Sequence, residues 1–319
     1  MSATDEKTLT GLLAGLPMNW GRWGAEDEVG ALNYLGAEEV RAGMAAVRDH
    51  RTFTLGVPIA LPSGDPVFPG RWAARHYMVA DKAGFAAGHW HAMPGGLEFA
   101  DDYVSGFAQA GTHCDALGHM WFDDTLWNGY PAESTNGGMK RASIEPIARR
   151  GIVGRAVLLD LARWRGKPHL GRAETIDHRD LVACAKAQGI EIAPRSILLI
   201  RTGWVGALLS GDERVADGYW EPGLTFSPDL VRWFHEMQIP AFATDSLANE
   251  TTYEPETGFM LVLHAALMRN LGIAFMEMMW LDDLAADCAE DRRYEGFYCA
   301  SPVRVTNGTG GALNPVFIK

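Results

Sequence analysis

The segment VGRAVLLDL, residues 153–161, is the first of three short apolar runs that decide the expected fold. It is followed by ILLIRT at residues 197–202 and by IPAFAT at residues 239–244. Apolar runs of this length, rich in leucine or β-branched residues, are typical of buried strands. Amphipathic patterns at residues 177–188 and 228–237 separate them and predict helices. Alternating strands and helices predict an α/β fold.

The alternation continues on the C-terminal side of this centre. We expect a helix at residues 261–270, a strand at 273–279, a short helix after Asp282 and a closing strand that ends in NPVFIK. Together with the central runs, these elements predict a mixed β-sheet with flanking helices.

On the N-terminal side the pattern is less regular. Residues 36–49 predict a helix, and residues 52–59 alternate as a half-buried strand does. Residues 60–100 are rich in glycine, proline and aromatic residues, so we expect a long functional loop there. Because no repeat or linker divides the chain, we expect a single domain over residues 51–319, preceded by an aromatic arm and helix over residues 1–50.

The composition excludes several classes of function. The 319 residues include 28 Lys and Arg against 40 Asp and Glu, which gives a net charge of −12 and argues against nucleic-acid or acidic-membrane partners. No apolar stretch reaches the length of a membrane span, and the N-terminus lacks the pattern of a signal peptide, so we expect a cytoplasmic protein. The four cysteines are far apart, which indicates core thiols rather than a structural zinc site.

The densest chemical signal is the segment QAGTHCDALGH, residues 109–119. On a strand, His113 and Asp115 would point to the same face, as two ligands of one metal must, and Gln109 has the same parity. If the strand ends near Ala116, His119 can return to the site as a base without binding metal. Imidazole and carboxylate ligands without cysteine suit an open catalytic site for Zn²⁺ or Mn²⁺. From spacing alone, the same residues can also be polar groups that backbone hydrogen bonds satisfy.

The run AGTHCDALGH resembles the signature of the bacterial cyclase family of metal hydrolases, H-x-G-T-H-x-D-A-x-x-H. Residues 23–34 (WGAEDEVGALNY), 201–204 (RTGW) and 263–277 (LHAALMRNLGIAFME) are also similar to the family, so the resemblance spans most of the chain. The family includes kynurenine formamidase (arylformamidase), isatin hydrolase and a trans-dienelactone hydrolase. The resemblance implies its swivelling β/β/α fold and a homo-oligomer, either dimer or tetramer, in which the N-terminal aromatic arm could reach a neighbouring subunit's site.

The resemblance also implies a divalent metal held by His113, Asp115, His264 and Glu277, with His119 as the acid/base. Gln109 stands where the arylformamidases have a metal-ligating histidine. A neutral amide is a weaker zinc ligand than imidazole, so we expect one tightly bound Zn²⁺ or Mn²⁺, with Gln109 as a weaker candidate ligand.

His264 and Glu277 also stand out without the family. His264 lies in the apolar run FMLVLHAALM, and Glu277 is the one charge in IAFMEMMWL. A buried imidazole or carboxylate needs a partner. Each could instead be a core histidine bonded to a carbonyl or a glutamate facing solvent.

Six further residues are candidates for the walls of a substrate pocket. Five lie in the expected loop, namely Tyr77, Phe85, His89, Trp90 and His91, and the sixth is Trp23 near the N-terminus. A surface loop is an equally good interpretation for the GHWHAMPGG segment, and core packing is the ordinary role of a tryptophan such as Trp23.

These residues predict a metal-dependent hydrolase that opens or cleaves a small amide: a cyclic amide, an imide or an aryl formamide. Water activated by the metal would attack the carbonyl, and His119 would move the proton. The alternatives are a lactone hydrolase with the same mechanism, a metal-dependent lyase or cyclase, and a non-catalytic metal-binding protein.

Overall fold

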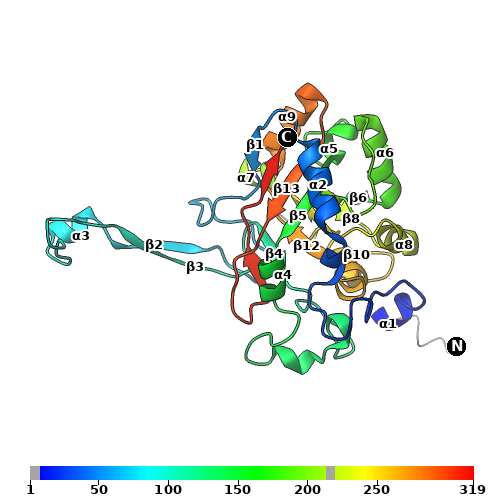
Figure 1. The fold of residues 1–319 in the computed structure, drawn as a ribbon, viewed down its shortest axis with the longest axis horizontal. Coiled ribbons are helices and arrows are strands. Elements are labelled where there is room, and N and C mark those ends of the chain that lie inside the picture. Colours follow the sequence, from blue (N-terminus) through cyan, green and yellow to red (C-terminus); the bar gives the residue numbers. More distant parts are fainter. Residues whose placement is uncertain (1–7, 213–219) are drawn as a thin grey trace.

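The computed structural model describes residues 8–212 and 220–319 and centres on one mixed sheet (Figure 1). Within those residues the sheet has nine strands. In spatial order they are β1 (Thr52–Thr54), β15 (Val316–Ile318), β13 (Glu295–Ala300), β5 (Ile152–Asp160), β7 (Ile197–Arg201), β9 (Ala241–Thr244), β12 (Ala274–Glu277), β4 (His113–Asp115) and β14 (Gly310–Ala312). The central four, β5, β7, β9 and β12, are parallel, and the outer strands pair antiparallel. The expected α/β fold with a mixed sheet is confirmed.

Helices and short strands surround the sheet. The α-helices of the body are α1 (Leu9–Leu12), α2 (Ala37–Ala46), α4 (Ile144–Arg150), α5 (Leu161–Trp164), α6 (His178–Gln188), α7 (Trp204–Leu209), α8 (Pro228–Glu236) and α9 (Asp282–Asp291). The 3₁₀ turns are η2 (Gly30–Tyr34), η3 (Trp127–Gly129) and η4 (Ala132–Thr135). Two small ladders pair β6 (Thr175–Ile176) with β8 (Gly223–Leu224) and β10 (Tyr253–Glu254) with β11 (Phe259–Met260).

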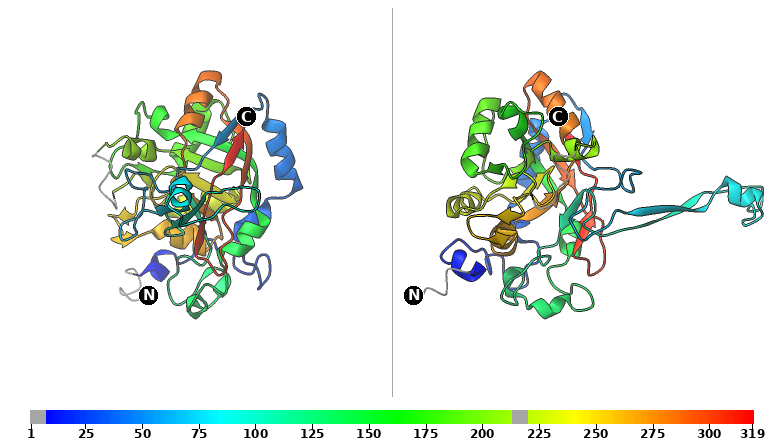
Figure 2. Two further views of the ribbon diagram at one scale, coloured as in Figure 1. Left: turned by 90° about the vertical axis from the view of Figure 1, so that its left-hand side faces the viewer. Right: turned by 180° about the vertical axis from the view of Figure 1, so that it is seen from behind.

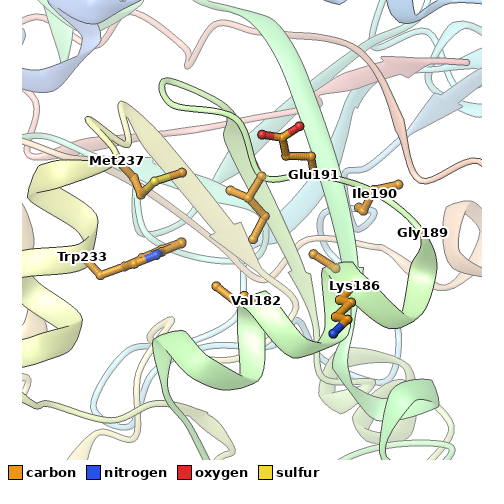
Figure 3. A pocket seen from close by; sticks show the side chains of 9 residues that line it. Val182, Lys186, Gly189, Ile190, Glu191, Trp233 and Met237 are labelled. Carbon is orange, nitrogen blue, oxygen red and sulfur yellow. The ribbon is translucent and has the colours of Figure 1, made fainter.

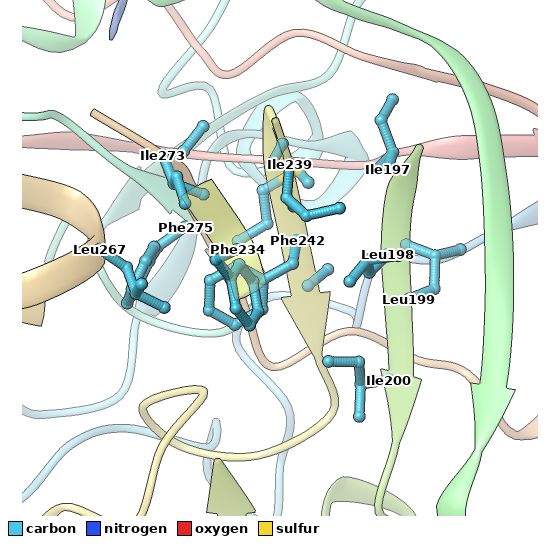
Figure 4. Packing of buried hydrophobic residues seen from close by; sticks show 14 of the residues in the cluster. Ile197, Leu198, Leu199, Ile200, Phe234, Ile239, Phe242, Leu267, Ile273 and Phe275 are labelled. Atoms are coloured by element: carbon cyan, nitrogen blue, oxygen red, sulfur yellow. The ribbon is translucent and has the colours of Figure 1, made fainter. Parts of the chain in front are cut away.

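The three apolar runs form the central strands β5, β7 and β9, as expected. Most of their residues are buried, which accounts for their apolar composition. β5, β7 and β9 fall within a residue or two of the predicted ranges; β9 begins only at Ala241, after Pro240, which has no N–H for the ladder. Aromatic rings then join strands to helices. Phe242 lies 5.4 Å from Phe234 of α8 and 4.6 Å from Phe275 of β12, between ring centroids (Figure 4).

The predicted helices are also present, with identifiable ends. Asp177 caps α6, because its carboxylate accepts the backbone N–H groups of Arg179 and Asp180. Ser227 caps α8 in the same way, and Pro228 occupies the first turn. The helix expected at residues 261–270 is instead a π-helix, η6 (His264–Arg269), in which the Asn270 N–H bonds to the Ala265 carbonyl.

The interpretation of residues 60–100 as a loop is wrong for residues 75–86, which form strand β2 and helix α3. Strands β2 (Arg75–Ala80) and β3 (Asp101–Ser105) pair antiparallel, and α3 (Lys82–Ala86) lies between them. This projecting hairpin, residues 75–105, extends far from the body (Figures 1 and 2). Almost every residue of both strands is exposed, so the sequence lacks the alternation that marks a strand with one buried face.

The N-terminal segment packs on its own chain. The Trp20 indole N–H donates to the Arg269 carbonyl at 2.8 Å, and the Arg269 guanidinium lies 4.6 Å from the Trp20 ring centroid. Gly30 has a positive φ of 58°, and a Cβ there would lie 2.3 Å from the Gly272 carbonyl oxygen, so the close approach requires glycine. In the part of the chain that the structure describes, we find no helix with the length and apolarity needed to cross a membrane.

Candidate metal and acid/base site

Strand register brings the first candidate residues together. β4 pairs antiparallel with β12 so that His113 is directly opposite Glu277, and Cys114 is opposite Met276. Residues directly opposite each other in such a ladder point to the same face. Asp115, two residues after His113, shares that face, whereas Cys114 points to the other one, into the apolar core.

Four buried side chains converge at this point. The His113 Nε2 atom lies 3.4 Å from a Glu277 oxygen and 3.6 Å from an Asp115 oxygen. The Nε2 atom of His264, from η6, lies 3.4 Å from the other Glu277 oxygen and 3.9 Å from the other Asp115 oxygen. Metal bonds of about 2.1 Å at tetrahedral angles place ligand atoms about 3.4 Å apart. His113, Asp115 and Glu277 each offer a ligand atom within 4.8 Å of the other two, so these three fit a single cation, and His264 stays a predicted fourth ligand.

The hydrogen-bond inventory also fits a cation. The His113 Nδ1 atom donates to the Gly111 carbonyl at 2.9 Å, which leaves Nε2 as the nitrogen that faces the carboxylates. Within the described residues, neither His113 Nε2 nor Asp115 Oδ1 has a hydrogen-bond partner, although both atoms are buried. Buried polar atoms without partners are costly, and a cation bound to them would remove that cost.

Glu250 orients His264, and the sequence analysis missed it. One Glu250 carboxylate oxygen lies 2.6 Å from His264 Nδ1 and accepts the His264 backbone N–H at 2.8 Å; the other accepts the Leu263 N–H at 2.7 Å. The imidazole Nε2 atom is thereby directed at Asp115 and Glu277. Glu250 is the only charged residue in the run LANETTY, residues 247–253, and that was the one sign of a special role. Its partner His264 is 14 residues away, so the sequence did not connect the two.

The electrostatics of the four side chains are strongly coupled. Burial lowers the pKa of His264, but hydrogen bonds and charges from Glu250 and Glu277 outweigh it and raise the pKa to about 10. Burial raises the pKa of Glu277, but its contacts with His113 and His264 outweigh it and lower the pKa to about 2. The carboxylates therefore hold positive charge in this cluster at neutral pH.

His119 lies at the edge of the cluster. Its side chain is 18% exposed, and its Nε2 atom lies 3.9 Å from Asp115 Oδ1. Burial, opposed by the charge of Asp115, lowers the pKa of His119. The Gln109 amide nitrogen donates to the Thr309 hydroxyl at 2.9 Å and lies 3.5 Å from His119 Nδ1. Gln109 thus contacts the acid/base candidate, and its role as a metal ligand stays a prediction.

A cavity of about 280 Å³ opens onto these residues. Its walls combine the polar cluster with an arginine and several apolar side chains: Asp115, His119, His264, Glu277, Arg71, Phe68, Met120, Ala248 and Leu261. A larger apolar hollow of about 530 Å³ lies between α6 and α8, lined by residues that include Val182, Ile190 and Trp233 (Figure 3). None of the predicted metal or acid/base residues lies among its described lining residues.

The structure does not bring the six predicted pocket residues to this cavity within one chain. Tyr77, Phe85, His89, Trp90 and His91 are on the projecting hairpin, where the Phe85 and Trp90 rings pack against Phe99. Trp23 packs against Tyr34 and Trp127, with ring centroids 5.1 and 6.3 Å away. None of the six is among the described residues that line the cavity.

Comparisons with known proteins point to one family. The family model named Cyclase matches residues 53–251. A crystal structure described as a novel cyclase is 34% identical, with a TM-score of 0.86 over 95% of this chain and 98% of that one. Isatin hydrolase A from Ralstonia solanacearum is 19% identical, with a TM-score of 0.60 over 84% of this chain and 92% of that one. An isatin hydrolase bound to thioisatinate is 18% identical, with a TM-score of 0.56 over 90% and 97%. No curated protein matches the sequence.

Replacing Glu250 by glutamine should weaken metal binding. The amide cannot accept all three hydrogen bonds, so His264 loses its orientation, and we expect the dissociation constant for Zn²⁺ or Mn²⁺ to rise about tenfold to a hundredfold. Competition with a chelator measures this constant. Glu254→Gln is the matched control, because Glu254 is also buried and accepts a hydrogen bond from Thr225 outside the cluster. Equal affinity in both variants would contradict the role of Glu250.

Metal binding should release protons and strengthen as the pH rises. With a pKa of about 10, His264 is protonated at pH 7, and an imidazole must lose that proton to bind a metal. We expect at least one proton released for each ion bound at pH 7 and a higher affinity at pH 9 than at pH 6. Titration calorimetry in buffers with different ionisation enthalpies counts the protons. Binding without proton release would show that His264 is not a ligand.

Proposed function

The chain belongs to the cyclase family, and on this basis we propose that it is a metal-dependent hydrolase that opens or cleaves a small amide. The observation that supports the proposal is the convergence of four buried ligand side chains beside His119, at the wall of a cavity. Two of the similar structures are isatin hydrolases, which supports a cyclic amide as the substrate class. A lactone offers the same kind of carbonyl and is the nearest variant.

In this proposal, His113, Asp115, His264 and Glu277 hold the metal. Two nitrogen and two oxygen ligands without thiolate suit Zn²⁺ or Mn²⁺. A divalent cation at this point would supply the Lewis acidity that lowers the pKa of a water molecule and polarises a carbonyl. The contacts of Gln109 with Thr309 and His119 favour one such ion rather than two.

His119 is the proposed acid/base. Its lowered pKa keeps the imidazole neutral at pH 7, so it can accept a proton from the attacking water. The resulting imidazolium lies close to the Asp115 carboxylate, which stabilises the charge, and it can return the proton to the leaving nitrogen. The apolar walls formed by Phe68, Met120 and Leu261 limit the water around this step.

Replacing His119 by alanine should abolish most of the activity and leave metal binding intact. We expect kcat to fall about a hundredfold to ten-thousandfold, since general acid–base catalysis contributes this much, with an unchanged metal content. The measurements are elemental analysis and a hydrolysis screen over N-formyl anilines, isatin-like lactams, cyclic imides and lactones. His235→Ala on α8 is the control histidine.

The same screen separates the alternatives. Hydrolysis in ¹⁸O-labelled water must place the label in the product, and turnover without incorporation would indicate a lyase or cyclase. A metal-loaded protein with no turnover on the panel, and no difference between wild type and His119→Ala, would indicate a non-catalytic metal-binding protein.

We further propose that the projecting hairpin docks on a second copy of the chain. A two-stranded hairpin is marginally stable alone in water, yet β2 and β3 expose large apolar side chains, among them Tyr77, Val79, Tyr103 and Val104. Trp20 and Trp23 of the N-terminal segment have contacts within their own chain. In this proposal the hairpin reaches the neighbour, and its tip would bring Trp90 and the adjacent histidines to the neighbour's cavity.

Shortening the hairpin tests this assembly. Replacing residues 75–105 by an Asn-Gly turn should convert the oligomer to a monomer, because the exposed apolar side chains of β2 and β3 are removed. Light scattering with size-exclusion chromatography measures the mass. Trp90→Ala should keep the oligomer and raise KM if the tip lines a neighbour's cavity. A wild-type monomer, or an oligomer that survives the replacement, would contradict the proposal.

A further inference from the structure

Arg71 lies in the cavity wall next to the proposed metal and acid/base residues, and nothing in the mechanism so far uses it. It follows Pro69 and Gly70, and its backbone N–H bonds to the Phe68 carbonyl at 3.0 Å. Gly70 has a φ of 93°, so this is a tight turn that glycine permits. The turn places the guanidinium beside the cavity.

The loop that carries Arg71 is held at several points. The Asp65 carboxylate, 8% exposed, accepts the backbone N–H of Leu61 and that of Ala74, each at 2.8 Å. The Gly111 N–H bonds to the Pro66 carbonyl at 3.1 Å and so ties the loop to the segment that leads into β4. Arg71 is therefore fixed relative to His113 and Asp115.

The Arg71 guanidinium has N–H donors that the hydrogen bond described next does not use. One nitrogen, Nη1, donates to the Gln109 carbonyl at 3.2 Å, and the group lies 5.4 Å from the Phe68 ring centroid. An arginine has five N–H donors, and a neutral carbonyl takes one. Among the described residues no carboxylate lies within ion-pair distance of Arg71, whereas Arg201 pairs with both Asp160 and Asp282.

Charge in the cavity is the second observation. Of the residues described, Arg71 is the one lysine or arginine in the cavity wall. Asp115, Glu277 and Glu250 contribute three carboxylates at or behind that wall, and a divalent cation would balance two. An anionic ligand would meet repulsion here unless a fixed cation received it, and guanidinium recognises carboxylate through paired hydrogen bonds.

We propose that Arg71 binds a carboxylate of the substrate, so that the amide carries an anionic group close to the carbonyl that is attacked. This inference rests on the proposed hydrolase function and narrows its substrate class to small carboxylated amides. Arg71 acts on binding and specificity and takes no part in proton transfer. A neutral amide of the same size lacks this contact and binds less tightly.

A matched pair of substrates tests the proposal in the metal-loaded enzyme. N-formylanthranilate and formanilide differ by one carboxylate. Arg71→Met should lower kcat/KM for N-formylanthranilate about tenfold to a hundredfold, chiefly through KM, and leave formanilide within about threefold of wild type. Arg71→Lys, which keeps the charge and loses the paired geometry, should give an intermediate loss. Arg41→Met, at an exposed position on α2, is the control.

Binding provides a readout that does not depend on turnover. Calorimetry with anthranilate should show a dissociation constant about tenfold to a hundredfold weaker in Arg71→Met than in wild type or Arg41→Met. If this loss occurs while no amide is hydrolysed, the carboxylate site stands and the hydrolase function fails. Equal losses on both substrates, or unchanged anthranilate binding, would overturn the role of Arg71.

Discussion

The antiparallel register between β4 and β12 is the constraint on which the rest of the site depends. It sets His113 opposite Glu277 on one face of the sheet and Cys114 opposite Met276 on the other. Since side chains alternate along a strand, a slip by one residue would move the ligand atoms into the apolar core and the core residues into the cavity. Core packing and the polar cluster therefore select the same register, and each reinforces the other.

That register brings together buried ionisable side chains, whose burial does not by itself stabilise the fold. Two imidazoles and two carboxylates are buried here, and each imidazole lies within 4 Å of both carboxylates. In the described structure, His113 Nε2 and Asp115 Oδ1 have no hydrogen-bond partner. Burial of this kind costs free energy unless opposite charges and hydrogen bonds compensate, and Glu250 supplies part of the compensation from behind His264. Proteins accept such local costs mainly at functional sites.

The features that could be predicted from the sequence are those that a short run of neighbouring residues indicates. The apolar runs located β5, β7 and β9, Asp177 located the start of α6, and the spacing of His113 and Asp115 located one face of β4. The local sequence marked His264 and Glu277 as polar residues in apolar runs, but only the family resemblance assigned them to the same site as His113. The pairing of Glu277 with His113 across more than 150 residues, and the approach of His264 from η6, have no local signal.

Other features could not be predicted for identifiable physical reasons. The projecting hairpin exposes both faces of its strands, so the contrast between buried and exposed positions that marks a strand is missing. The role of Glu250 depends on how the chain turns between residues 250 and 264. Trp23, expected near a pocket, packs against Trp127 because η3 lies beside the N-terminal segment, which no local pattern indicates.

The π-helical turn that carries His264 has a mechanical consequence. At its far end, the Arg269 carbonyl receives the Trp20 indole, the Asn270 carbonyl receives the backbone N–H of Asn19, and the Leu271 carbonyl receives the Asn19 amide. The two ends of η6 are thus held by separate hydrogen bonds. Glu250 bonds the end that carries His264, and Asn19 and Trp20 bond the other end. The placement of the His264 imidazole therefore depends on contacts at both ends of the turn, including those that Asn19 and Trp20 make at the far end.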